Sequence, residues 1–340
     1  MTFTIAQIPP FFRFSRLFRR STARALFVAT TLSASCAAAS GFAPGDHLLR
    51  LTHDGQARSA IVHVPPQAAR GLPLPVVLNF HGASGDARSH QQYVGMDRLA
   101  DRVGFVVVYP NGTGPIPDQL LTWNAGACCG PAQADGVDDV GFVRALLDEI
   151  PRHLAADPAR IYATGLSNGA MLTYRLAAEA PERFAAIASV AGAMALVPFA
   201  PRAPISILHI HSVDDPLTRY AGGLGPPFSP GETRAMHAPV AETLARWRGF
   251  MGCPAQPITT AERREPGGSA AARQSATRLL WSPCRRGTEI VHWRLTGVGH
   301  VWPGSKRIYV QGVFGPPTDV IDANLEIWQF FRRHTLTQHR

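Results

Sequence analysis

The sequence comprises 340 residues, 46% of them hydrophobic and 17% charged, so it is long enough to bury the core of one large domain or two small ones. Its formal net charge is +9, but five of its arginines lie near the start of the chain. Subtracting these five from the 33 basic residues, against 24 acidic ones, leaves +4, a charge too small to indicate nucleic-acid binding. The five are Arg13, Arg16, Arg19, Arg20 and Arg24.

Residues 1–39 are predicted to be a secretory signal peptide. The arginines form its basic region, an apolar run from residue 25 to about 34 follows, and small residues around Ala39 provide a cleavage site. The run is shorter than the roughly twenty apolar residues that cross a bilayer, so we expect a secreted protein with no membrane partner after cleavage. Two variants of this export route stay open, a lipoprotein site at Cys36 and a twin-arginine signal at Arg19-Arg20.

Beyond the leader, short apolar runs alternate with helical patterns, which predicts a single α/β domain over residues 40–340. Most of the apolar runs are nearly continuous, as in strands of a parallel sheet with helices on both faces. A segment rich in Ala, Arg, Gly and Pro, residues 254–283, is predicted to be a loop or a small cap. Strands are expected at 59–64 (antiparallel), 75–80, 104–109, 160–164, 186–190, 205–210 and 290–295, and helices at 137–153, 170–180 and 320–333.

The segment from Gly165 to Gly169, with the sequence Gly-Leu-Ser-Asn-Gly, stands between a predicted strand and a predicted helix. A sharp strand-to-helix turn of this kind exposes a serine hydroxyl above the sheet edge, and glycines allow the two backbones to approach closely. The serine also lies at the N-terminus of the helix, where N–H groups and the helix dipole favour a developing negative charge. Ser167 is therefore predicted to be a nucleophile.

A serine nucleophile needs a histidine to accept its proton and a carboxylate to orient that histidine. Both follow Ser167 in the chain, each just after a predicted strand: Asp214-Asp215 after residue 210, and His300 after residue 295. His300 stands beside Gly299 and before a Trp-Pro turn, so it can reach over the sheet edge. Of the two adjacent aspartates we favour Asp215 as the orienting group, with Asp214 capping the turn.

The backbone N–H groups of Ala83 and Asn168 are predicted to form an oxyanion hole. Asn168 follows the nucleophile, and Ala83 lies in the glycine-containing loop after the strand that ends at residue 80. His209 and His211 alternate on one strand face, but no third ligand follows at a suitable spacing, so we expect neither a metal ion nor another cofactor.

Four cysteines remain after removal of the leader, namely Cys128, Cys129, Cys253 and Cys284. An even number in an exported protein indicates two disulfides, and three pairings are open. Cys253 and Cys284 flank the 254–283 segment, whereas the adjacent Cys128 and Cys129 must pair with each other or with separate partners.

Several segments together resemble the secreted polyhydroxybutyrate depolymerase/feruloyl esterase group of α/β hydrolases (carbohydrate esterase family 1, LpqC-like). The resemblance covers roughly residues 45–335 and implies ester hydrolysis through an acyl-enzyme, with Ser167, Asp215 and His300 as the triad. It also implies a Cys253–Cys284 bridge. The segments that carry it are His81-Gly-Ala-Ser, Tyr109-Pro-Asn-Gly, Trp123-Asn-Ala-Gly-Ala-Cys-Cys-Gly, Val137-Asp-Asp-Val-Gly-Phe, Gly165-Leu-Ser-Asn-Gly-Ala-Met and Gly299-His-Val-Trp-Pro-Gly.

The resemblance indicates the type of reaction more precisely than it indicates the substrate. The chain ends soon after the closing helix, so we expect soluble small-molecule or oligomeric esters, such as short hydroxyalkanoate, feruloyl or acetyl esters, rather than an insoluble polymer. Trp123 and Trp302 are candidate substrate-binding residues at the rim, with packing as the alternative. A glycine of the family's H-G-x-x-D-P turn is replaced by Ser212, while the aspartate before the proline is Asp215.

Two alternative functions stay open. One is a peptidase or acyltransferase with the same triad, and the other is a non-catalytic binding protein on this scaffold. The oligomeric state is left open.

Overall fold

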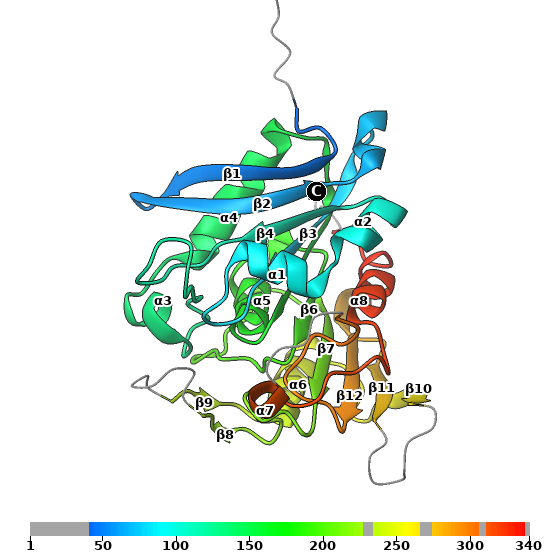
Figure 1. Ribbon diagram of the computed structural model, residues 1–340. Coiled ribbons are helices and arrows are strands. Elements are labelled where there is room, and N and C mark those ends of the chain that lie inside the picture. Colours follow the sequence, from blue (N-terminus) through cyan, green and yellow to red (C-terminus); the bar gives the residue numbers. More distant parts are fainter. Residues whose placement is uncertain (1–40, 227–233, 266–273, 306–310, 337–340) are drawn as a thin grey trace, which may run out of the picture. The chain divides into compact units, whose positions relative to one another are not determined.

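The computed structural model describes residues 41–226, 234–265, 274–305 and 311–336 (Figure 1). The predicted signal peptide, with Cys36 and the twin arginines, lies outside these residues. Among the described helices, none is both long enough and apolar enough to cross a membrane.

Within the described residues, ten strands form one mixed sheet in the order β1-β2-β4-β3-β5-β6-β7-β12-β11-β10. The six central strands, from β4 to β12, run parallel, and two antiparallel strands extend each edge (Figure 1). The strands are β1 Gly45–His53, β2 Gln56–Val64, β3 Leu74–Phe80, β4 Val106–Pro110, β5 Ala156–Leu166, β6 Ala186–Val190, β7 Ser206–Ser212, β10 Ile258–Arg264, β11 Ser275–Trp281 and β12 Ile290–Thr296. The prediction of a parallel centre and an antiparallel early strand is confirmed.

The central strands are buried along most of their length because helices cover both faces of the sheet. In β3, Val76 and Leu78 belong to one hydrophobic cluster and Val77 to the other, as the two-residue period of a strand requires. Helices α4 Asp139–Glu149, α5 Asn168–Glu179 and α6 Val240–Met251 pack into the first cluster. Helices α1 Ala87–Val94, α2 Asp97–Val103 and α8 Ala323–Phe331 pack into the second.

Smaller elements connect this framework. They are the helices α3 Gly130–Ala134 and α7 Gln311–Phe314, the short strands β8 Gly223–Leu224 and β9 Met236–His237, which pair with each other, and the 3-10 turns Pro66–Arg70, Ile150–Arg152, Pro181–Arg183 and Arg285–Gly287.

The 254–283 segment is not the loop or small cap that its composition suggested. It contributes β10 and β11, an antiparallel pair that extends the sheet beyond β12. Because β10 is exposed along most of its length, it lacks the apolar run by which a buried strand is recognised. A Cys253–Cys284 disulfide closes the base of this hairpin, and a second disulfide joins Cys128 to Cys129.

Candidate active site

Ser167 occupies a strained turn between β5 and α5. Its φ of 58° and ψ of −120° fall in a region that non-glycine residues rarely adopt, and such strain is concentrated at functional sites. Hydrogen bonds on both sides of the turn hold it in place: the Ser167 N–H donates to Val190 O at 2.9 Å, and the Met171 N–H donates to Ser167 O at 3.0 Å.

The flanking glycines let helix and sheet approach each other more closely than any side chain would permit. A Cβ added at Gly165 would lie 2.7 Å from the carbonyl carbon of Gly169 and 2.9 Å from Phe80 O. A Cβ at Gly169 would collide with the carbonyl oxygens of Phe80 and His81. The end of β3 and the start of α5 are thereby brought into direct contact.

Asp215 and His300 meet at the carboxyl ends of neighbouring parallel strands, β7 and β12. The His300 Nδ1 lies 2.7 Å from Asp215 Oδ2, and both side chains are almost completely buried. Asp214 turns elsewhere, and its Oδ2 accepts a hydrogen bond of 2.6 Å from the Gly297 N–H. The geometry thus pairs His300 with Asp215 and uses Asp214 to hold the loop before His300.

Asp215 is held as a carboxylate. Its Oδ1 accepts hydrogen bonds from the N–H groups of Leu217 and Thr218, at 2.9 and 2.8 Å. Burial by itself would raise the pKa of Asp215, but the charge of His300 and the hydrogen bonds from His211 and His300 outweigh it, so the pKa lies well below its usual range. Asp215 can therefore orient and stabilise an imidazolium at position 300.

The loop after β3 packs directly against the serine. A Cβ added at Gly82 would lie 3.3 Å from Ser167 Cβ, and a turn closed by the Gly85 N–H and Gly82 O follows at 3.1 Å. This loop carries Ala83, while Asn168 is the first residue of α5, where N–H groups have no partner within the helix. Both predicted oxyanion donors thus belong to segments that flank Ser167.

His81 stabilises this loop. Its Nε2 accepts a hydrogen bond from the Gly112 N–H at 3.0 Å, and its Nδ1 lies 2.8 Å from Gly82 O. Burial lowers its pKa to about 4, so the ring is neutral at physiological pH.

The prediction that Trp123 and Trp302 line the rim is wrong, because both indoles lie in the interior. Their exposed fractions are 0% and 1%. Trp302 Nε1 donates to Asn324 Oδ1 at 3.0 Å, and Trp123 Nε1 donates to His81 O at 2.9 Å. The backbone of Trp123 also forms two hydrogen bonds with the side chain of Asn168, at 2.7 and 2.9 Å, so Trp123 joins the His81 loop to the turn at Ser167.

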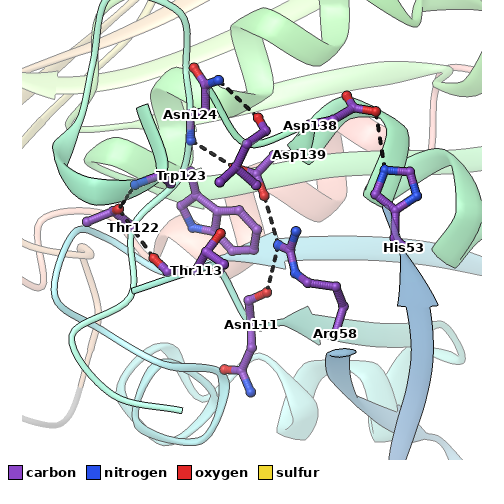
Figure 2. A network of polar contacts seen from close by, with 12 residues as sticks. His53, Arg58, Asn111, Thr113, Thr122, Trp123, Asn124, Asp138 and Asp139 are labelled. Carbon is purple, nitrogen blue, oxygen red and sulfur yellow. Dashed lines mark hydrogen bonds and ion pairs between the residues drawn. The ribbon is translucent and has the colours of Figure 1, made fainter. Parts of the chain in front are cut away.

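A buried ion pair holds the loop that carries Trp123 (Figure 2). Arg58 Nη2 on β2 donates to Asp139 Oδ1 at 2.8 Å and to Asn111 O at 3.2 Å. The other carboxylate oxygen, Asp139 Oδ2, accepts from the Asn124 N–H at 2.8 Å. Sequence analysis missed this support, because Arg58 and Asp139 are 81 residues apart and Arg58 belongs to no recognisable motif.

His237 on β9 was also missed. It is 4% exposed, and neither ring nitrogen has a hydrogen-bond partner among the described residues. Burial and the charge of His300 lower its pKa to about 4, so it is neutral and lies within electrostatic range of the Asp215–His300 pair. Its two-residue strand leaves no pattern in the sequence that could have identified it.

Among the described residues, the side chains close enough together to hold a metal ion are Asp46, His63 and Asp97. None of them belongs to the candidate active site, and His63 is already hydrogen-bonded to Asp46 and Asp101.

A parallel sheet covered by helices on both faces, with a serine at a strand-to-helix elbow, defines an α/β hydrolase. In agreement, the structure of an acetyl xylan esterase from Aspergillus awamori superposes with a TM-score of 0.51 and 18% identity, covering 77% of this chain and 96% of that one. This similarity concerns the fold alone.

Sequence comparison identifies the family. The esterase PHB depolymerase family matches residues 58–220. The chain is also 32% identical over 273 residues to NocK of Nocardia uniformis subsp. tsuyamanensis, which is named as an esterase; the match covers 77% of this chain and 75% of that protein. The chain therefore belongs to this family of carboxylic ester hydrolases.

A more distant relative combines two activities. The bifunctional acetylxylan esterase/xylanase of Neocallimastix patriciarum is 28% identical over 250 residues, and the match covers 72% of this chain but only 31% of that protein.

Proposed function

We propose that this protein is a secreted serine esterase that forms an acyl-enzyme on Ser167. The observation that carries the proposal is the buried Asp215–His300 hydrogen bond of 2.7 Å, formed by two residues that follow a strained nucleophile turn in chain order.

In the first half of the reaction, Ser167 Oγ attacks the ester carbonyl while His300 Nε2 accepts the serine proton. Asp215 remains ionised and stabilises the resulting imidazolium. The N–H groups of Ala83 and Asn168 stabilise the oxyanion of the tetrahedral intermediate. The imidazolium then returns the proton to the leaving alcohol, and in the second half water attacks the acyl group by the same route.

The substrates we propose are soluble esters with short hydroxyalkanoate, acetyl or feruloyl groups. Membership of the esterase PHB depolymerase family supports the hydroxyalkanoate esters, and the acetylxylan esterase and feruloyl esterase among the relatives support the acetyl and feruloyl esters. Export is supported by the leader-like sequence of residues 1–39 and by two disulfides, which are typical of oxidising compartments.

Labelling and kinetics with Ser167→Ala test the proposal. A fluorophosphonate should modify the parent protein once, at Ser167, and the variant should lose activity by at least about a thousandfold while keeping its fold. Ser89→Ala, at an exposed position of α1, is the matched control and should retain both labelling and activity. A Ser167→Ala variant with substantial activity would refute the assignment of the nucleophile.

An ester panel tests the reaction itself. It should comprise p-nitrophenyl acyl esters, methyl ferulate, acetylated xylan and a hydroxybutyrate oligomer, together with amides and alternative acyl acceptors. Amide turnover equal to ester turnover would favour a peptidase, transfer to an acceptor in preference to water would favour an acyltransferase, and absence of labelling would favour a binding protein.

A further inference from the structure

A line of buried aromatic side chains leads from the core to Asp215. Tyr174 Oη on α5 lies 3.0 Å from His209 Nδ1, and His209 Nε2 lies 3.2 Å from His211 Nδ1. His211 Nε2 in turn lies 2.7 Å from Thr218 O and 3.3 Å from Asp215 Oδ2, the oxygen that also binds His300. Tyr174, His209 and His211 are at most 1% exposed, so no solvent competes for these contacts.

The positions of the protons in this line follow from its ends. Thr218 O can only accept, so His211 Nε2 must carry a hydrogen. In a neutral ring the Nδ1 of His211 is then an acceptor, and it must receive the Nε2–H of His209. His209 Nδ1 is therefore also an acceptor, and the hydroxyl of Tyr174 is its donor. Every hydrogen bond in the line points toward Asp215.

A branch of the same cluster has a different end point. His292 Nδ1 on β12 lies 3.0 Å from the carbonyl oxygen of His209, so this nitrogen carries a hydrogen. His292 Nε2 is then an acceptor, and it receives the hydroxyl of Tyr220 at 2.9 Å. The branch ends on a backbone carbonyl and not on Asp215.

Burial keeps the rings of His209 and His292 neutral. It holds the pKa of His209 well below its ordinary value and lowers that of His292 to about 3. His211 is itself faced by titratable groups from several elements. These are His209 on its own strand, Asp215 and Tyr220 on the following loop, His237 on β9 and His292 on β12. Arg294 acts on His292, and His300 lies beyond Asp215.

We propose that His211 is a positioning residue for Asp215, and that Tyr174 selects the tautomer in which His211 donates to the carboxylate. This inference rests on the proposed role of Asp215 in ester hydrolysis. With the opposite tautomer, the bare Nε2 of His211 would face the oxygens of Thr218 and Asp215 and repel both. With the proposed tautomer, two backbone donors hold Oδ1 while His211 and His300 share Oδ2.

The tautomers can be measured directly in the full-length protein labelled with 15N-histidine. Two-bond nitrogen–carbon-bound proton correlations distinguish Nε2–H from Nδ1–H rings, and single-histidine variants assign the signals. We expect Nε2–H for His209 and His211, and Nδ1–H for His292. An Nδ1–H or doubly protonated His211 would overturn the proposal, and this readout does not depend on whether Ser167 is the nucleophile.

Two tyrosine variants provide a matched kinetic test. Tyr174→Phe removes the hydroxyl that orders the line to Asp215, whereas Tyr220→Phe removes an equivalent hydroxyl from the branch. We expect Tyr174→Phe to lower kcat severalfold with little change in KM, and to move the acid limb of the pH profile to higher pH, because a less well solvated carboxylate attracts the imidazolium more strongly. Tyr220→Phe should leave both properties unchanged, and equal effects of the two variants would refute the assignment.

Direct replacement of His211 completes the test. His211→Phe should lower kcat about tenfold or more and shift the acid limb in the same direction, and His211→Gln, which keeps an N–H donor, should restore most of the loss. A fall in kcat with an unmoved acid limb in His211→Phe would mean a merely structural role. Fluorophosphonate labelling of the parent protein is scored separately, so failure of the proposed function is distinguishable from failure of this inference.

Discussion

Replacing Asp139 by asparagine would leave the guanidinium of Arg58 without a counter-charge in the interior. The two side chains are 0% and 2% exposed, respectively, so water cannot take the place of the carboxylate. Asparagine also fits poorly, since its single oxygen can face either Arg58 Nη2 or the Asn124 N–H, while its amide group then faces the other donor.

We expect Asp139→Asn to lower the free energy of unfolding by about 3–5 kcal/mol, the usual cost of removing one partner from a buried ion pair. Activity should fall as well, because the same carboxylate holds the loop that carries Trp123, and the Trp123 N–H is hydrogen-bonded to the side chain of Asn168. Adding Arg58→Met to this variant removes the stranded charge and should recover about 1–3 kcal/mol. Urea denaturation at pH 7.5 and turnover of p-nitrophenyl acetate measure the two effects.

The neighbouring Asp138→Asn is the matched control. Its side chain is 53% exposed and caps α4 through the Gly141 N–H, a role that asparagine fills equally well, so we expect a change below about 0.5 kcal/mol. A cost below about 1 kcal/mol for Asp139→Asn, or a double variant as unstable as the sum of its parts, would refute the reasoning.

Three further predictions concern stability. Gly169→Ala should lower the free energy of unfolding by about 1–3 kcal/mol and remove most of the activity. Gly249→Ala in α6, where a Cβ meets nothing within 4 Å, should be neutral or stabilising. Thermal melts that rank the two variants the other way would contradict the packing argument. Replacing both Cys253 and Cys284 by serine opens a loop of 31 residues and should cost roughly 3–4 kcal/mol in urea denaturation; an unchanged midpoint would refute this. The pKa of His292 is lowered to about 3, so the unfolded chain binds one more proton than the folded protein at pH values below about 6.5. This residue alone should lower the free energy of unfolding by about 1.2 kcal/mol between pH 6 and 5. A pH dependence of stability no less steep in His292→Phe would count against this prediction.

The sequence predicted the features that depend on local pattern. Buried parallel strands must be apolar on both faces, so β3 to β7 were found from their composition. The turn at Ser167 was found because close packing of β5 and α5 leaves room only for glycine at two fixed positions. The order of Ser167, Asp215 and His300 follows from strand order, since the carboxyl ends of parallel strands meet at one edge.

Other features depended on contacts between distant segments. A tryptophan can lie either at the rim of a site or in the core, so the residue type alone did not locate Trp123 and Trp302. Only the packing of the loops over them places both side chains in the interior. The β10–β11 hairpin escaped detection because an exposed edge strand gains its stability from backbone pairing, which does not constrain side chains.

The amino-acid sequence by itself therefore determined the class of fold, the strand-to-helix turn at Ser167 and the position of His300 after its strand, because each rests on short-range spacing and on alternation of apolar and polar residues. Only the tertiary structure shows that the favoured Asp215 faces His300, which ion pair holds the Trp123 loop, and which contacts order the line from Tyr174 to Asp215. Those choices depend on atoms brought within hydrogen-bonding distance from separate strands and helices, where burial makes an unpaired polar group costly.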